Sequence, residues 1–241
     1  EYHRYNGLGS WQTTLYYAPA LGNCPTGTKV TVRTSTAEGQ QSDTCLDALG
    51  RTIRSSKLGF DGTKIHEDYE YDNRGLLKWQ SIPHFSGTST SWTKKTYDVL
   101  GRESLVNRAD GVNVQTVYDG LKTTTTVLNT GQEKIQHVNA LGELVLVQDA
   151  IGGVVGNVYN AAGDLVKSST AEYLFAPTSI DVEMQYDDYG KKLLTDDPDK
   201  GLWTYKYNAF GEVVEQEDAK GQISKMTYDP MGRMRTRKEY A

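Results

Sequence analysis

Four histidines are the first residues of this 241-residue chain whose type could do chemistry, because an imidazole binds metals and transfers protons. They are His3, His66, His84 and His137. No two of them have the spacing of roughly three to five residues that is typical of paired zinc ligands. We therefore interpret them as surface or sheet-packing residues. His84 follows a proline in a long insertion, and we expect it to be the most exposed of the four.

Carboxylates gather at Asp196, Asp197 and Asp199, where they could serve as calcium ligands. Pro198 interrupts the group, and no glutamate stands where an EF-hand loop needs one. The cluster leads into Gly201, so turn formation is the better interpretation. The sequence contains neither a Gly-x-Ser-x-Gly string nor a phosphate-binding glycine loop. We predict no catalytic, cofactor-binding or metal-binding residue and expect no enzyme activity.

Cys24 and Cys45 are the two cysteines, and they lie 21 positions apart. They are either two free thiols or a disulfide. A chain rich in glycine, threonine and tyrosine favours the disulfide, which would imply an oxidising compartment. The bond would contribute about 3 kcal/mol by restricting the unfolded chain.

The elements that must position these residues are strands and turns. The chain has 24 Gly and 16 Tyr, and 37% of its residues are hydrophobic, so we expect a thin core with a wet sheet face or a cavity. A net charge of −5 argues against nucleic acid as a partner. No apolar run is long enough to predict a transmembrane helix. The chain begins at Glu1 without an apolar leader, so we expect a mature product or a piece of a longer protein.

A Tyr-Asx-x-x-Gly motif recurs along the chain, and repetition indicates a structural unit rather than an active site. Weaker copies begin at Leu46, Tyr118 and Val138, and Tyr5–Gly9 is a candidate leading copy. The period is about 21 residues, with insertions that include 81–92 and 168–179. The motif residues to which we assign a structural role are Tyr71, Asp72, Gly75, Tyr97, Asp98, Gly101, Arg102, Tyr159, Gly163, Tyr186, Asp187, Gly190, Tyr207, Gly211, Tyr228, Asp229 and Gly232.

Each motif residue has a mechanical explanation. Tyrosine ends a strand and packs on the sheet, and Asp or Asn accepts a hydrogen bond from the backbone two residues on. Glycine supplies a positive φ. Arg, Glu, Asp and Lys all follow the glycine, which we interpret as the tolerance of a solvent-exposed strand start.

Two strands and two turns fit into each period, because a second turn follows every motif. We therefore predict an all-β fold, a curled antiparallel strip of β-hairpin repeats forming a partial spiral shell. A single repeat array would span 1–241, with leading degenerate repeats at 1–45, clear repeats at 46–233 and a tail strand at 234–241. The spacing of the two cysteines would place them at equivalent points of adjacent repeats.

The repeated motif, as in "TYDVLGR", resembles the YD repeats of the RHS family. That family includes bacterial polymorphic toxins, the B and C components of Tc toxin complexes, and teneurin ectodomains. The resemblance covers most of the chain, most firmly 46–233. It implies a strip of sheet that closes into a hollow shell around a toxin polypeptide, or a cell-surface adhesion role as in teneurins.

Three functions compete. The first is a non-catalytic segment of such a shell within a larger secreted or cell-surface bacterial protein, with the rest of the shell and an enclosed polypeptide as partners. The second is an adhesive or carbohydrate-binding module, in which Trp79, Trp92 and Trp203 could stack on sugar rings. The third is an enzyme, for which we nominate no residue. Self-association through the open sheet edges is a further expected property.

Overall fold

The computed structural model describes residues 2–6, 10–17, 24–36, 38–88, 90–171 and 179–240. Every regular element within these ranges is a β-strand, and they contain no helix. Contacts divide the chain into two compact units. Unit 1 comprises Glu1–Thr116 and Val127–Gly131, and unit 2 comprises Val117–Thr126 and Gln132–Ala241.

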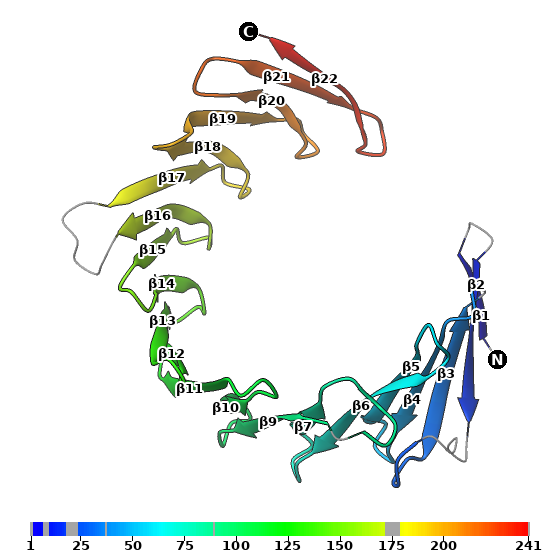
Figure 1. Cartoon of the computed structure of the whole chain (residues 1–241). Coiled ribbons are helices and arrows are strands. Elements are labelled where there is room, and N and C mark those ends of the chain that lie inside the picture. The colour runs from blue at the N-terminus through cyan, green and yellow to red at the C-terminus, as the bar shows by residue number, and fades with distance from the viewer. Residues whose placement is uncertain are drawn as a thin grey trace. The chain divides into compact units, whose positions relative to one another are not determined.

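Unit 1 is an antiparallel meander in which most strands pair with the strand that follows them in sequence (Figure 1). Its strands are β1 (Tyr2–Asn6), β2 (Ser10–Tyr17), β3 (Val30–Thr36), β4 (Gln41–Leu46), β5 (Thr52–Leu58), β6 (Lys64–Tyr71), β7 (Leu77–Ser81), β8 (His84–Phe85), β9 (Trp92–Tyr97) and β10 (Glu103–Asn107). Two further strands, β11 (Asn113–Asp119) and β12 (Lys122–Val127), contribute residues to both units.

Unit 2 repeats the same meander, and its strands follow one another along a curved strip (Figure 1). They are β13 (Gln132–Val138), β14 (Leu144–Gln148), β15 (Val154–Tyr159), β16 (Leu165–Ala171), β17 (Ile180–Tyr186), β18 (Lys192–Asp197), β19 (Gly201–Tyr207), β20 (Val213–Glu217), β21 (Ile223–Tyr228) and β22 (Met234–Tyr240). The predicted all-β strip of hairpin repeats is confirmed.

Turns alternate between the two long edges of each strip. The Tyr-Asx-x-x-Gly turns, such as the one that joins β19 to β20, lie on one side, which we call the motif edge. The second turns, such as the one that joins β20 to β21, lie on the other side, which we call the opposite edge. Every motif turn is therefore stacked beside the motif turns of the neighbouring repeats.

The core is thin, as the low aliphatic content predicts. The buried hydrophobic residues of the described chain are Cys45, Val154, Met184 and Met226. Most other strand residues are half-buried, because each packs against its neighbours on one face of a single sheet layer. Five polar side chains of unit 1 are buried as well, namely Thr31, Asp43, Ser56, His66 and Ser81. The structure contains no helix that is long and apolar enough to span a membrane, within the residues described.

The insertion at 81–92 differs from a simple loop. It contains β8, which folds back and pairs with β6, with Ile65 opposite Phe85 and His66 opposite His84. Ser89 of this insertion lies outside the described residues, as do 172–178 of the second insertion and 7–9 of the predicted leading copy.

Candidate functional site

The motif turn is held by four backbone and side-chain hydrogen bonds around its aspartate. At Asp98, Oδ1 accepts from the N–H groups of Leu100 and Arg102, both at 2.9 Å. The Gly101 N–H donates to the Asp98 carbonyl at 3.1 Å, and the Asp98 N–H donates to the Arg102 carbonyl at 2.9 Å. Gly101 has φ = 81°, a left-handed conformation that costs a β-carbon-bearing residue free energy. The Arg102 N–H is the main cause of a lowered pKa at Asp98.

The same pair of side-chain hydrogen bonds occurs throughout the array. It is made at Asp47, Asp72, Asn139, Asn160, Asp187, Asn208 and Asp229. Asp149 and Asp218 make it in turns of the opposite edge. The bond to the second residue on is the predicted Asx-turn, and the bond to the fourth residue is an addition that the sequence interpretation missed.

The acidic cluster also makes a turn. Asp197 Oδ1 accepts from the N–H groups of Asp199 and Lys200, at 2.9 and 3.2 Å. These bonds orient the carboxylate toward the backbone that leads into Gly201, where φ is 72°. The geometry agrees with turn formation rather than with an open cation site.

The motif tyrosines join one repeat to the previous one. The Tyr207 hydroxyl donates to the Lys192 carbonyl at 2.8 Å, and the Tyr228 hydroxyl donates to the Val213 carbonyl at 2.8 Å. Tyr71, Tyr97 and Tyr159 make the same bond, to Thr52, Leu77 and Leu144 respectively. The acceptor is always the second residue after the motif glycine of an earlier turn. Each tyrosine is therefore a polar tether between neighbouring repeats as well as a packed ring.

Tyr186 departs from this pattern. Its hydroxyl donates to the Met184 sulfur at 3.9 Å, which is a weak acceptor. The insertion at 168–179 lies between Tyr186 and the preceding motif turn. Tyr186 thus offers a natural comparison for the tethered tyrosines.

In six of the motif turns the residue after the glycine is matched to the Asx residue of the same turn, whereas in the Asp72 turn that residue is Leu76 and Asp72 pairs with Arg74. Three aspartates pair with arginine, and the distances are 2.7 Å for Asp47–Arg51, 2.7 Å for Asp98–Arg102 and 2.8 Å for Asp229–Arg233. Three asparagines donate their side-chain N–H to a carboxylate, at 2.6 Å for Asn139–Glu143, 2.9 Å for Asn160–Asp164 and 2.6 Å for Asn208–Glu212. A carboxylate only accepts, whereas an amide also donates, so in these six turns the partner fits the Asx type. In these six turns the residue after the glycine is therefore a partner of the Asx side chain as well as the start of a strand.

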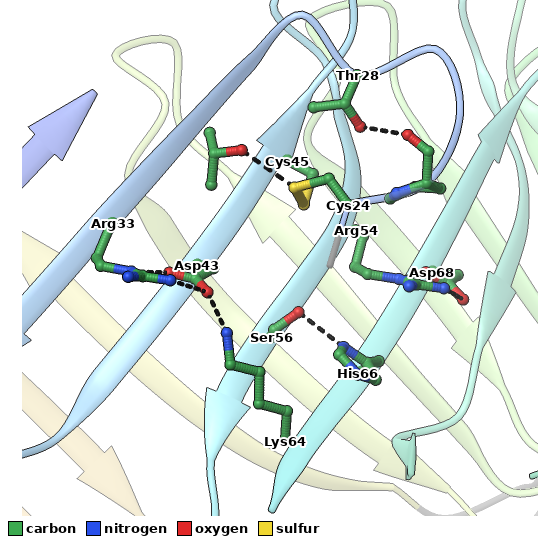
Figure 2. Close-up of a disulfide and its surroundings, with 12 residues drawn as sticks. Cys24, Thr28, Arg33, Asp43, Cys45, Arg54, Ser56, Lys64, His66 and Asp68 are labelled. Atoms are coloured by element: carbon green, nitrogen blue, oxygen red, sulfur yellow. Dashed lines mark hydrogen bonds and ion pairs between the residues drawn. A yellow bond between two sulfur atoms is a disulfide. The ribbon is translucent and has the colours of Figure 1, made fainter. Parts of the chain in front are cut away.

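A disulfide fastens the start of the array, as Figure 2 shows. Cys24 and Cys45 are bonded with an S–S distance of 2.05 Å. Cys45 is fully buried in β4, and Cys24 lies in the segment that precedes β3. The bridge therefore joins a loop to a strand, and the prediction of equivalent points in adjacent repeats was wrong. The Cys24 sulfur also lies 3.1 Å from the Thr31 hydroxyl.

Asp43 is the most buried ionisable group near the disulfide (Figure 2), with 1% of its side chain exposed. Arg33 binds both of its carboxylate oxygens, at 2.6 and 2.9 Å, and Lys64 donates to it at 2.6 Å. Burial opposes ionisation of Asp43, but these two cations outweigh burial and hold its pKa well below the ordinary value. The three residues tie β3, β4 and β6 together.

His66 lies beside this cluster and is also buried. Its Nδ1 is 2.8 Å from the Ser56 hydroxyl, and its Nε2 is 2.6 Å from the Ser86 hydroxyl. Burial, followed by the charge of Arg54, lowers the pKa of His66, so the ring is neutral near neutral pH. The contact to Ser86 fastens the folded-back insertion onto β6.

His84 lies against His66, with 6.0 Å between the ring centroids. Its side chain is 11% exposed, and its Nε2 lies 3.5 Å from Asp68, which also pairs with Arg54. His84 is therefore half-buried, because β8 packs back on the sheet, although it is more exposed than the buried His66. His3 lies in β1 and His137 in β13. Within the part of the chain that the structure describes, no group of three or more His, Cys, Asp or Glu could hold a metal ion.

Comparison with solved structures places this geometry among known folds. TcdB2-TccC3 aligns over 95% of this chain with a TM-score of 0.72 and 18% identity. A form without its hypervariable C-terminal region gives a TM-score of 0.67 at 18% identity over 95% of the chain. The Tc holotoxin pore of Photorhabdus luminescens gives 0.68 at 17% over 96%.

The chain spans 14% of the first of these chains and 13% of the other two. No protein-family profile matches the sequence, and no curated protein is similar to it. The likeness at this identity concerns the fold, which is the all-β, antiparallel hairpin-repeat fold seen in these Tc toxin structures.

Proposed function

We propose that this chain is a non-catalytic structural segment of an RHS-type shell. It would be part of a larger secreted bacterial protein that encloses or delivers a toxin polypeptide. The observation that carries the proposal is the use of the motif side chains. Tyr207 and Tyr228 tie repeat to repeat, and Asp98 and Asn208 are occupied by their own turns. These side chains hold the sheet together and are therefore not available for catalysis or ligand binding.

The similarity to TcdB2-TccC3 and to a Tc holotoxin pore supports the toxin context, because the RHS family includes the B and C components of Tc complexes. The Cys24–Cys45 bond supports a secreted or cell-surface location, because such bonds persist in oxidising compartments. A thin, single-layer sheet also suits a wall around a lumen better than a compact binding domain.

Protease protection in the longer protein that carries this chain tests the proposal. The native protein and a variant with Gly211→Val would be digested in parallel with a broad-specificity protease. Gly211 has φ = 86°, a backbone conformation that a β-branched residue rarely adopts, and the Lys191 side chain lies 3.2 Å from the position that a Cβ would take. An enclosed non-repeat polypeptide should survive in the native protein and be digested in the variant. Equal digestion in both, or no non-repeat polypeptide, would exclude encapsulation.

A second function, carbohydrate binding, is favoured by one groove in unit 2. Trp203, Gln216, Gln222 and Arg237 line a cavity of about 380 Å³. An aromatic ring beside amide and guanidinium donors is a combination that suits a sugar. Trp79 offers a matched control, because the Lys94 ammonium lies 5.3 Å from its ring centre.

A glycan array distinguishes carbohydrate binding from a purely structural role in the shell. Saturable binding that Trp203→Ala abolishes and Trp79→Ala preserves would establish a carbohydrate module. Absence of binding by the unmodified chain would eliminate it.

A further inference from the structure

A groove of about 500 Å³ lies in unit 1 beside the disulfide. Three parts of the chain line it, namely the loop that follows Cys24, the strands β5 and β6 with their adjoining turn, and the first residue of β9. We call it the disulfide groove, and its lining includes Pro25, Thr26, Arg54, Asp68, Glu70 and Trp92. All of these residues belong to unit 1, so the groove is formed within a single compact unit.

The disulfide holds the loop side of the groove in place. Cys45 lies opposite Arg54 of β5, so both side chains lie on one face of the sheet (Figure 2). The bond from Cys45 to Cys24 therefore fastens the adjacent Pro25 to this face. A groove whose side is fastened in this way is formed before any ligand arrives, which is usual for a binding site.

Both arginines that line the groove are neutralised by carboxylates. Arg54 donates to the two oxygens of Asp68 at 2.5 and 2.7 Å, and Arg51 pairs with Asp47 at 2.7 Å. An anionic ligand would have to displace a carboxylate from one of these charge-assisted contacts. The two ion pairs therefore argue against phosphate or carboxylate as the ligand.

Glu70 supplies the remaining charge of the groove. Its side chain is exposed, and it makes no hydrogen bond or ion pair with the residues that the structure describes. Lys94, which follows Glu70 and Trp79 in the same row across the sheet, lies over the Trp79 ring at 5.3 Å. Three carboxylates and two guanidinium groups line the groove, which leaves one negative charge in excess. This excess favours a cationic ligand.

An aromatic ring in the same groove favours a guanidinium in particular. The combination is already present once, because the Arg51 guanidinium lies 4.6 Å from the centre of the Tyr71 ring while it pairs with Asp47. Trp92 and Glu70 offer a second ring and carboxylate, and no charged group of the described chain lies over the Trp92 ring. A planar guanidinium stacks on an indole and pairs with a carboxylate at the same time, whereas an ammonium is a compact point charge.

We propose that the disulfide groove binds an arginine side chain of a partner polypeptide, with its guanidinium stacked on Trp92 and paired with Glu70. Ser81 of β7 lies opposite Trp92, and β7 also pairs with β6, so the strands of Glu70 and Trp92 are two strand spacings apart, about 9.6 Å. A cavity of about 500 Å³ accommodates an arginine side chain between them. The site requires unit 1 alone and is therefore independent of whether this chain encloses a polypeptide.

A titration of the full chain with a capped arginine tests the proposal. The probe is N-acetyl-arginine methylamide, and binding is followed by NMR through the indole N–H signal of Trp92, which a Trp92→Phe variant assigns. N-acetyl-citrulline methylamide is the control, because a neutral urea replaces its guanidinium. One exposed ion pair and one ring contact are each weak, so we expect a Kd of about 1–10 mM for the arginine probe. The citrulline probe should bind at least about tenfold more weakly.

Two substitutions locate the counter-ion. Glu70→Gln keeps the shape of the side chain and removes its charge, so it should weaken binding of the arginine probe about fivefold. Glu38→Gln is the matched control, because Glu38 is an exposed carboxylate of unit 1 outside the groove, and it should leave the affinity unchanged. Circular dichroism checks that both variants keep their fold, which exposed positions should allow.

Three results would overturn the proposal. The first is the absence of a saturable shift of the Trp92 signal. The second is equal affinity for the two probes, which would assign the groove to a neutral ligand such as a sugar. The third is the same effect of Glu70→Gln and Glu38→Gln, which would reduce binding to a general effect of surface charge.

Discussion

The motif tyrosines provide the sharpest prediction, because three of them differ in a single hydrogen bond. Tyr207 and Tyr228 each donate to a backbone carbonyl of an earlier turn at 2.8 Å, whereas Tyr186 donates to the Met184 sulfur at 3.9 Å. All three rings are half-buried in unit 2. Replacement by phenylalanine keeps the ring and removes the hydroxyl, so the comparison isolates the tether.

The expected magnitude follows from the net value of one hydrogen bond. Losing the tether at Tyr207 or Tyr228 should reduce the free energy of unfolding by about 1 kcal/mol. Because the two tyrosines have different acceptors, Lys192 and Val213, the double variant should lose about 2 kcal/mol. Tyr186→Phe should cost no more than a few tenths of a kcal/mol, since a thioether is a weak acceptor.

Hydrogen exchange is the appropriate assay, because a repeat array opens in parts and a single melting temperature would average over them. Removing a 1 kcal/mol tether should speed exchange of the amides in the tethered repeats about fivefold. Exchange in unit 1 should be unchanged. Equal effects at Tyr186 and Tyr207 would refute the tether, because ring packing would then account for the whole contribution of the tyrosine.

Three further predictions concern the turns, the disulfide and the buried histidine. Asn208→Asp should destabilise unit 2 by roughly 0.5 kcal/mol, because it sets a second carboxylate against Glu212, and adding Glu212→Arg should restore stability. Thermal unfolding of both variants checks this, and a double variant that is not rescued would contradict the matching of the Asx residue to its partner. Replacing Cys24 and Cys45 by serine should lower the free energy of unfolding by about 3 kcal/mol in urea, and a thiol titration of the denatured unmodified chain should find no free thiol. Because the pKa of His66 is lowered in the folded state, the unfolded chain binds this proton first as the pH falls, so the free energy of unfolding should be full above about pH 6.5 and decline below it. In His66→Asn, the stability of β6 measured by hydrogen exchange should depend less on pH. An unchanged pH dependence would assign the decline to other groups.

The repeat and its turns could be predicted because their chemistry is local. Asp98 accepts from residues two and four positions on, and the positive φ of Gly101 is a property of one residue. Both the Asx hydrogen bonds and the glycine conformation are therefore determined within five consecutive residues. Antiparallel meander topology then follows, because short turns connect each strand to the next.

The tether was missed because it is not local. The Tyr207 hydroxyl reaches a carbonyl 15 residues earlier, and the motif alone does not distinguish a packed ring from a hydrogen-bonded one. The same reason explains His84, whose burial depends on β8 pairing with β6 across the insertion. Cys24 could not be placed either, since it lies in a segment without a repeat pattern.

The matching of Asx to its partner is a different case, because the signal was present in the sequence. Arginine follows the aspartate motifs at Asp98 and Asp229, and glutamate follows the asparagine motifs at Asn139 and Asn208. Considered separately, the Asx position and the position after the glycine each tolerate several residue types. Only the hydrogen bonds in the structure show that, in these four turns, the residue after the glycine matches the Asx residue.

A cryo-EM map of the proposed larger protein that contains this chain would test the central claim most directly. The account predicts that these repeats form part of a single-layer wall around a lumen, with density for a non-repeat polypeptide on the inner side. Repeats that pack into a solid body without a lumen, or a lumen that holds no polypeptide, would contradict it.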